Sequence, residues 1–138
     1  MKVQIVLPDK LRLQVYEHAL SDPLHETCGL LGGQRDSLTS YYPVKNIALD
    51  PARQYLMDPA GQITAMKQMR EQNEELTAIF HSHTDAPAQP SRTDLDMAYY
   101  PDVTYLILTL QESPPELNAF FFDGTQFLPQ QIVYETRD

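Results

Sequence analysis

Cysteine and tryptophan are scarce in this chain, which has one cysteine and no tryptophan among 138 residues. The single cysteine, Cys28, cannot form a disulfide within the chain. It also leaves no Cys-x-x-Cys pair, which a zinc deaminase would require. So little cysteine fits a reducing compartment, where disulfides are rare.

Positive charge is scarce as well. Ten Lys and Arg residues stand against nineteen Asp and Glu residues, which gives a formal net charge of −9. Nucleic-acid surfaces and anionic membranes both attract proteins through clustered Lys and Arg. The composition therefore argues against a nucleic acid or a membrane as the partner.

Long apolar segments are also missing. No apolar run approaches the roughly 18 residues of a membrane span. The first ten residues, MKVQIVLPDK, lack the apolar region of a signal peptide, so we expect a cytoplasmic protein. The length suits one domain, residues 1–138, whose core needs no disulfide.

Apolar patterns predict a mixture of strands and helices. Apolar runs that alternate or are continuous indicate strands, while Asp58-Pro59 marks a helix start and Asp22-Pro23 a helix end. Expected strands cover residues 3–8, 27–33, 38–46, 54–57, 76–80, 103–110, 116–122 and 126–134, and expected helices cover residues 8–22, 58–73 and 92–99. This mixture predicts an α/β or α+β domain with helices packed against one twisted, mixed β-sheet.

Two of the four histidines, His81 and His83, are separated by one residue at the end of a predicted strand. In an extended chain these side chains point to the same side, so both imidazoles can bind one metal ion. Asp94 opens the next predicted helix and can add an oxygen ligand. Two histidines and one carboxylate form a known catalytic zinc set, which leaves the fourth position for water.

The same residues also have purely structural interpretations. A His-x-His pair can be a polar strand end, and Ser91-x-x-Asp94 has the spacing of a helix capping box. Capping and metal binding are compatible, because Asp94 can accept from the backbone and still face a metal. The residues alone leave both interpretations open.

The stretch HSHTDAPAQPSRTD, from His81 to Asp94, resembles the signature of the JAMM metallopeptidases, the active members of the MPN-domain family. That family pairs this signature with a glutamate further upstream in the chain. Glu26, in the run HETCGLLGG, stands at the matching position. The resemblance covers most of the chain, and every position of the family's signature is filled.

The resemblance implies a single MPN/JAMM domain with a cytidine-deaminase-like fold and one Zn²⁺ ion per chain. By the same resemblance, His81, His83 and Asp94 are the metal ligands, Glu26 is the general base, and Ser91 is a hydrogen-bond donor to the oxyanion. Nothing else in the sequence distinguishes Glu26 from the other glutamates. Capping alone would equally account for Ser91.

Thr84 follows the second histidine, where many members of the family have proline. The combination HSHT…PSRTD resembles the bacterial branch that trims small ubiquitin-like sulfur-carrier proteins. This resemblance implies hydrolysis of the peptide or isopeptide bond after the carrier's C-terminal Gly-Gly, for example to release cysteine from a carrier–cysteine conjugate. Two alternatives stay open, a broader isopeptidase that removes ubiquitin-like proteins from lysines and a metal-free, non-catalytic MPN scaffold.

Several neighbouring residues have expected supporting roles. Cys28 lies in an apolar run and is expected to pack as a small hydrophobic residue rather than bind the metal. His18 is expected on a helix surface and His25 in a solvated loop. The candidates to orient the metal ligands are Ser82, Thr93 and Asp96.

Overall fold

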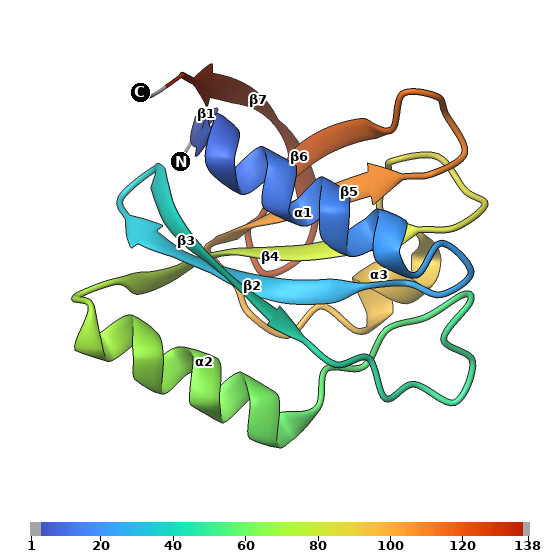
Figure 1. Cartoon of the computed structure of the whole chain (residues 1–138), viewed down its shortest axis with the longest axis horizontal. Helices are drawn as coiled ribbons and strands as arrows, with labels where there is room; N and C mark the ends of the chain where they lie inside the picture. Colours follow the sequence, from blue (N-terminus) through green and yellow to red (C-terminus); the bar gives the residue numbers. More distant parts are fainter. Residues whose placement is uncertain (1–3, 137–138) are drawn as a thin grey trace.

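Seven strands and three helices make up the part of the chain that the structure describes. The structure is a computed structural model, and it describes residues 4–136 (Figure 1). The strands are β1 (Gln4–Pro8), β2 (Cys28–Gln34), β3 (Ser37–Val44), β4 (Glu75–His83), β5 (Val103–Thr109), β6 (Glu116–Phe122) and β7 (Phe127–Glu135). The helices are α1 (Asp9–Ser21), α2 (Pro59–Glu71) and α3 (Arg92–Asp96). Across this range no helix is both long enough and apolar enough to cross a membrane.

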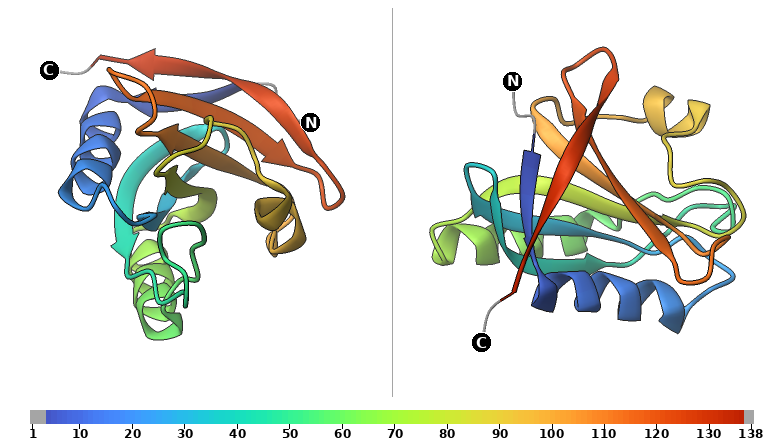
Figure 2. Two further views of the ribbon diagram at one scale, coloured as in Figure 1. Left: turned by 90° about the vertical axis from the view of Figure 1, so that its right-hand side faces the viewer. Right: turned by 90° about the horizontal axis from the view of Figure 1, so that it is seen from above.

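The strands form one mixed sheet that closes on itself in the order β1-β3-β2-β4-β5-β6-β7. Strand β1 pairs in parallel with β3 and β7, and β4 pairs in parallel with β5, whereas the other neighbours are antiparallel. The contact between β1 and β3 is a single pair, Val6 with Ser37. Figure 2 shows how strongly the sheet curls. The expected mixed, twisted sheet packed with helices is therefore confirmed.

The central strands are buried on both faces. On β4, Phe80 packs in one core cluster with the buried side of α1, whereas its neighbour Ile79 packs in a second cluster with α2. On β2, Leu31 and Leu30 divide between the same two clusters. Because successive strand residues point to opposite faces, a strand covered on both sides has a continuous apolar sequence. This explains why these strands were predicted from their apolar runs.

Two expected elements differ from the structure. The helix expected at 92–99 ends at Asp96, and none of its residues is fully buried, so no apolar face extends it beyond its capped first turn. The short strand expected at 54–57 is reduced to one isolated bridge between Asn46 and Met57. Residues 47–56 instead form an irregular loop, and this loop lies beside the candidate site.

Strand pairing determines where the candidate residues meet. Strand β4 lies between β2 and β5, and His81 pairs with Cys28 on one side and with Ile107 on the other. Since β2 and β4 are antiparallel, the start of β2 lies beside the end of β4. Glu26, two residues before Cys28, is thereby carried to the strand end that holds His81 and His83.

Candidate metal centre

Three side-chain donors converge at the end of β4. The Nε2 atoms of His81 and His83 are 3.2 Å apart. His81 Nε2 lies 3.2 Å from Asp94 Oδ1, and His83 Nε2 lies 3.0 Å from Asp94 Oδ2. Each residue offers one ligand atom within 4.8 Å of the others, so the expected cluster is present as a candidate metal site. Two imidazole nitrogens and a carboxylate oxygen form a donor set that fits zinc.

The environments of the two histidines differ. His83 Nδ1 lies 2.7 Å from the carbonyl oxygen of Pro87, so this nitrogen donates and Nε2 is turned toward the other candidate ligands. Burial would lower the pKa of His83, but its hydrogen bonds with Asp94 and the Pro87 carbonyl outweigh this effect and raise the pKa, so a metal ion at Nε2 would displace a proton. His81 is fully buried, and burial lowers its pKa, which favours the neutral ring. Its ring stacks on Tyr55 with 4.5 Å between centroids. Within residues 4–136 the buried His81 Nδ1 has no hydrogen-bond partner.

Asp94 takes part in the helix cap and also belongs to the candidate metal site. The Ser91 amide donates to Asp94 Oδ2 over 2.9 Å, and the Asp94 amide donates to Ser91 Oγ over 3.0 Å, which completes the capping box. The carboxylate is thereby aimed at the histidines. Burial alone would raise the pKa of Asp94, but hydrogen bonds from His81 and His83 outweigh it and hold the pKa well below its usual range. Asp94 is therefore an anion, as a metal ligand must be.

Glu26 is a buried carboxyl group at the same end of the sheet, with only 5% of its surface exposed. Its Oε1 atom is buried and has no hydrogen-bond partner in the described part of the chain. Burial raises the pKa of Glu26 to about 8, against an opposing effect of nearby His83. A carboxyl group with such a pKa and a free oxygen has the properties of a general base that works near neutral pH.

Ser91 caps α3, so its expected role as a helix cap is confirmed. Its side chain is exposed, and its Oγ accepts from the Asp94 amide. The hydroxyl proton is still available to a substrate oxygen. The role of Ser91 as an oxyanion donor stays a prediction.

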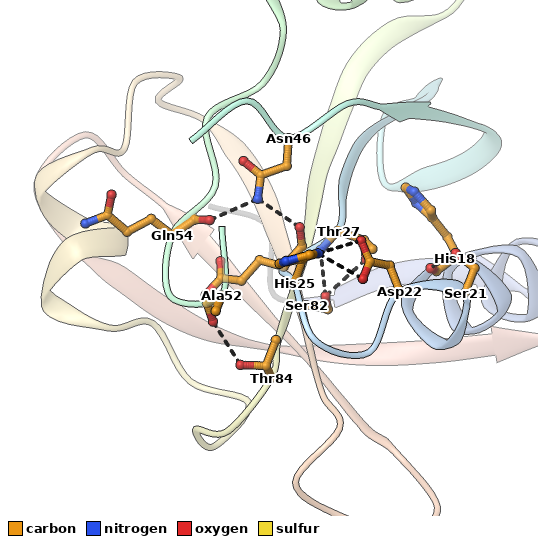
Figure 3. Close-up of polar contacts among 11 residues, drawn as sticks. His18, Ser21, Asp22, His25, Thr27, Asn46, Ala52, Gln54, Ser82 and Thr84 are labelled. Atoms are coloured by element: carbon orange, nitrogen blue, oxygen red, sulfur yellow. Dashed lines mark hydrogen bonds and ion pairs between the residues drawn. The ribbon is translucent and has the colours of Figure 1, made fainter. Parts of the chain in front are cut away.

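The expected supporting residues behave differently from one another. Ser82 is buried, and its Oγ accepts from the Thr27 amide over 2.9 Å, which ties β4 to the segment that carries Glu26 (Figure 3). Asp96 lies on the surface and pairs with Arg92, so it orients no ligand. Among the hydrogen bonds of residues 4–136, none joins the Thr93 side chain to the histidines or Asp94.

The other histidines and the cysteine lie outside the donor set. His25 is exposed, as expected, and lies 3.0 Å from the carboxylate of Asp22 (Figure 3). His18 was expected on the surface, but it is half-buried, and its Nδ1 lies 2.6 Å from the Tyr41 hydroxyl. Cys28 is buried, as expected, and burial raises the pKa of its thiol to about 12. Cys28 therefore packs as a neutral thiol.

Two features of the site were not predicted, and both belong to the irregular segment after β3. Tyr55 stacks on a metal-ligand candidate, and Asn46 bonds to the main chain of Glu26. Both residues fell within short expected strands, at 38–46 and 54–57, and nothing in those patterns indicated a contact with His81 or Glu26. Tyr55 also lines a cleft of about 480 Å³ together with Met97, Tyr99 and Tyr105. The cleft lies between this segment and the residues that follow α3.

Comparisons with a family model and with known proteins agree on one family. The model of prokaryotic homologs of the JAB domain matches residues 8–123. The chain is 32% identical over 130 residues to a desampylase from Haloferax volcanii, covering 92% of this chain and 91% of that protein. It is 33% identical over 97 residues to a CysO-cysteine peptidase from Mycobacterium tuberculosis, covering 69% and 66% of the two chains.

A solved structure supports the same fold. A JAB1/MPN domain protein from Archaeoglobus fulgidus superposes with a TM-score of 0.58, covering 94% of this chain and 96% of that chain. At 15% identity this likeness shows the fold alone. The match of the JAB model over most of the chain shows the family. The chain therefore belongs to the prokaryotic JAB family, the JAMM-type family that its histidine motif resembles.

Proposed function

We propose that this chain, as a single domain over residues 1–138, is a zinc-dependent metallopeptidase that hydrolyses the bond after the C-terminal Gly-Gly of a small ubiquitin-like sulfur-carrier protein. The observation that carries the proposal is the convergence of His81, His83 and Asp94 beside the buried, unpartnered carboxyl of Glu26. A non-catalytic scaffold would not need a base next to a complete ligand set.

Each residue has a distinct task in this reaction. His81, His83 and Asp94 hold one Zn²⁺ ion, which when bound polarises the scissile carbonyl and lowers the pKa of water. Glu26 takes the proton of the attacking water at its free oxygen and passes it to the leaving amine. The Ser91 hydroxyl donates to the carbonyl oxygen as negative charge develops on it.

The cleft beside Tyr55 supports binding of an extended tail. Its walls are mostly aromatic and apolar, from Tyr55 on one side and Met97 and Tyr99 on the other. Tyr99 is 81% exposed, so its ring is available to a partner. A Gly-Gly terminus lets the substrate backbone approach the metal closely, because glycine has no Cβ to clash. The carrier's globular part would then dock outside the cleft.

The nature of the leaving group separates the leading proposal from its alternative. A single amino acid, with cysteine preferred, is a small leaving group and needs no second protein to fit beside the site. The similarity to a CysO-cysteine peptidase supports this choice. The similarity to a desampylase keeps a broader isopeptidase, acting on lysine conjugates, as the second candidate.

The test offers zinc-loaded protein two substrates: a carrier ending in Gly-Gly-Cys, and the same carrier joined through Gly-Gly to a lysine side chain. Intact-mass spectrometry follows loss of the terminal cysteine from the first and separation of the chains in the second. We expect rapid trimming of the first substrate. Cleavage of the lysine conjugate alone would replace trimming with the isopeptidase function. Cleavage of neither, with zinc bound, would refute both peptidase functions, whereas protein that takes up no zinc would support the metal-free scaffold.

A further inference from the structure

Glu26 lies outside the sheet, although it is buried at the sheet's end. Strand β2 begins two residues later, at Cys28. Both main-chain polar groups of Glu26 are instead bonded to the segment 46–57. Its amide donates to the carbonyl of Pro51 over 2.7 Å, and its carbonyl accepts from the Asn46 side-chain amide over 2.9 Å. The position of this carboxyl group therefore depends on a loop.

Asn46 uses its whole side chain to hold that loop and Glu26 together. Its Nδ2 donates to the carbonyl of Glu26 over 2.9 Å. The same atom donates to the carbonyl of Gln54, also over 2.9 Å (Figure 3). Its Oδ1 accepts from the amides of Ala48 and Leu56, over 3.0 and 2.9 Å. An Asn side chain has two donor hydrogens and an oxygen that accepts two bonds, so every capacity is used, and every partner is a main-chain group.

The same segment reaches the metal ligands by contacts that do not involve Asn46. Tyr55 stacks on the His81 ring. Thr84, directly after His83, donates from its hydroxyl to the carbonyl of Ala52 over 2.9 Å (Figure 3). The segment is therefore fastened to the ligand strand by two contacts and to Glu26 by the Pro51 and Asn46 contacts. Of the last two, only the Asn46 contact comes from a side chain and can be removed by substitution.

We propose that Asn46 is a positioning residue for the Glu26 carboxyl group. The Asn46 amide fixes the Glu26 main chain relative to the ligand strand and so sets the reach of the carboxylate toward the reacting water. This inference rests on the proposed role of Glu26 as the general base. Reaction rates are sensitive to small displacements of a catalytic group, so loss of one such contact can cost about 10- to 100-fold.

The kinetic test compares Asn46→Ala and Asn46→Asp with a matched control, Thr84→Val. Asn46→Asp keeps the acceptor for Ala48 and Leu56 but loses both donors, so it serves even if the alanine variant folds poorly. Thr84→Val loosens the same loop without touching Glu26. We expect both Asn46 variants to bind zinc normally and to lose about 10- to 100-fold in kcat with little change in KM. Thr84→Val keeps the Asn46 and Pro51 bonds to Glu26 and the Tyr55 stacking, so it should lose clearly less kcat than either Asn46 variant. An equal loss would mean that the loop as a whole, and not Asn46, positions the carboxyl group, and would overturn the proposal.

A double variant separates positioning from general loosening. If Asn46 acts through Glu26, Asn46→Ala adds no further loss in a Glu26→Gln background, because residues that act as a unit are not additive. An equal loss in both backgrounds would overturn the proposal. Near wild-type kcat in both Asn46 variants would overturn it too. Full activity of Glu26→Gln itself would instead overturn the proposed function.

Amide hydrogen exchange supplies a readout that needs no activity. We expect Asn46→Asp to speed exchange of the Glu26 amide at least about tenfold, since opening of its bond to Pro51 becomes easier. The Thr27 amide, which donates to Ser82 Oγ, is the internal reference and should change little. Unchanged protection of the Glu26 amide would contradict the proposal. Equal loss of protection at both amides would indicate general loosening and would also contradict it.

Discussion

The two halves of the candidate site are held in different ways. His81 and His83 belong to β4, with hydrogen-bonded neighbours on both sides and the core beneath them. Glu26 and Asp94 lie outside the sheet and are held by individual polar contacts. The Asn46 side chain donates to the Glu26 carbonyl, and the Asp94 amide donates to Ser91 Oγ. The difference teaches that the half with the two histidines is preorganised by the sheet, whereas the half with the two carboxyl groups depends on individual polar contacts. Substitutions in the two halves should therefore have different effects on zinc binding and turnover.

The largest effect is expected in the sheet-held half. The double substitution His81→Ala/His83→Ala removes two of three ligands, so zinc occupancy should fall from one per chain to nearly none and activity should fall to background. Elemental analysis of protein purified without added metal measures the occupancy. The exposed loop variant His25→Ala is the control and should keep its zinc. Full occupancy in the double variant would refute the ligand assignment.

A large effect on rate alone is expected at the base. Glu26→Gln is nearly isosteric but cannot accept the proton, so kcat should fall by about 10²- to 10⁴-fold, or more, with zinc retained. Asp94→Asn, by contrast, should first lower zinc occupancy, because it weakens a ligand. Glu17→Gln, on the exposed side of α1, is the matched control. A zinc-bound Glu26→Gln variant with wild-type turnover would exclude this residue as the base.

A smaller effect is expected at Ser91, where two roles can be separated. Ser91→Ala removes the helix cap and should cost about 0.5–2 kcal/mol of stability. Ser91→Gly should cost only about a few tenths of a kcal/mol. Both variants lack the hydroxyl. If Ser91 is also an oxyanion donor, kcat falls equally in both while their melting temperatures differ. Turnover that follows stability instead would leave Ser91 as a cap only.

The last expected effect concerns stability and not turnover, and it is a pH dependence in zinc-free protein. Burial raises the pKa of Glu26 from 4.5 to about 8, so the folded state binds this proton more tightly than the unfolded chain does. The stability that this proton contributes is complete below pH 4.5 and is lost as the pH rises through about 8. The free energy of unfolding, measured with urea, should therefore fall more over this pH range for the wild type than for Glu26→Gln. Parallel curves would contradict the buried, unpartnered carboxyl.

How far the sequence predicts the site depends on whether a residue is placed by local geometry or by distant pairing. His81, His83 and Asp94 could be predicted because local geometry places them, with a strand setting two side chains on one side and a capping turn aiming the third. Glu26 required the family resemblance, because it reaches the site through antiparallel pairing with a strand about fifty residues later. Asn46 was expected at the end of a strand over 38–46, but β3 ends at Val44 and Asn46 lies in the loop that follows, whose bonds follow no period. No pattern therefore predicted its contact with Glu26.

The fold shows the same limits. Strands buried on both faces were predicted well, because their apolar runs are continuous. The closure of the sheet was not predicted, since it depends on β1 pairing with β7 at the far end of the chain. Helix α3 was expected to be longer than it is, because its capping signal is strong but no buried face extends it. Non-local pairing and missing burial account for these differences.

In the proposed metal centre, two strand histidines and one helix carboxylate hold a zinc ion, with a position left for water. X-ray absorption at the zinc edge of the purified protein tests this arrangement most directly. We predict two imidazole nitrogens at about 2.0–2.1 Å, oxygen in the remaining positions, and no sulfur. A sulfur neighbour at about 2.3 Å would contradict the account, because it would make Cys28 a ligand. Such a ligand would close the position that the proposed reaction requires.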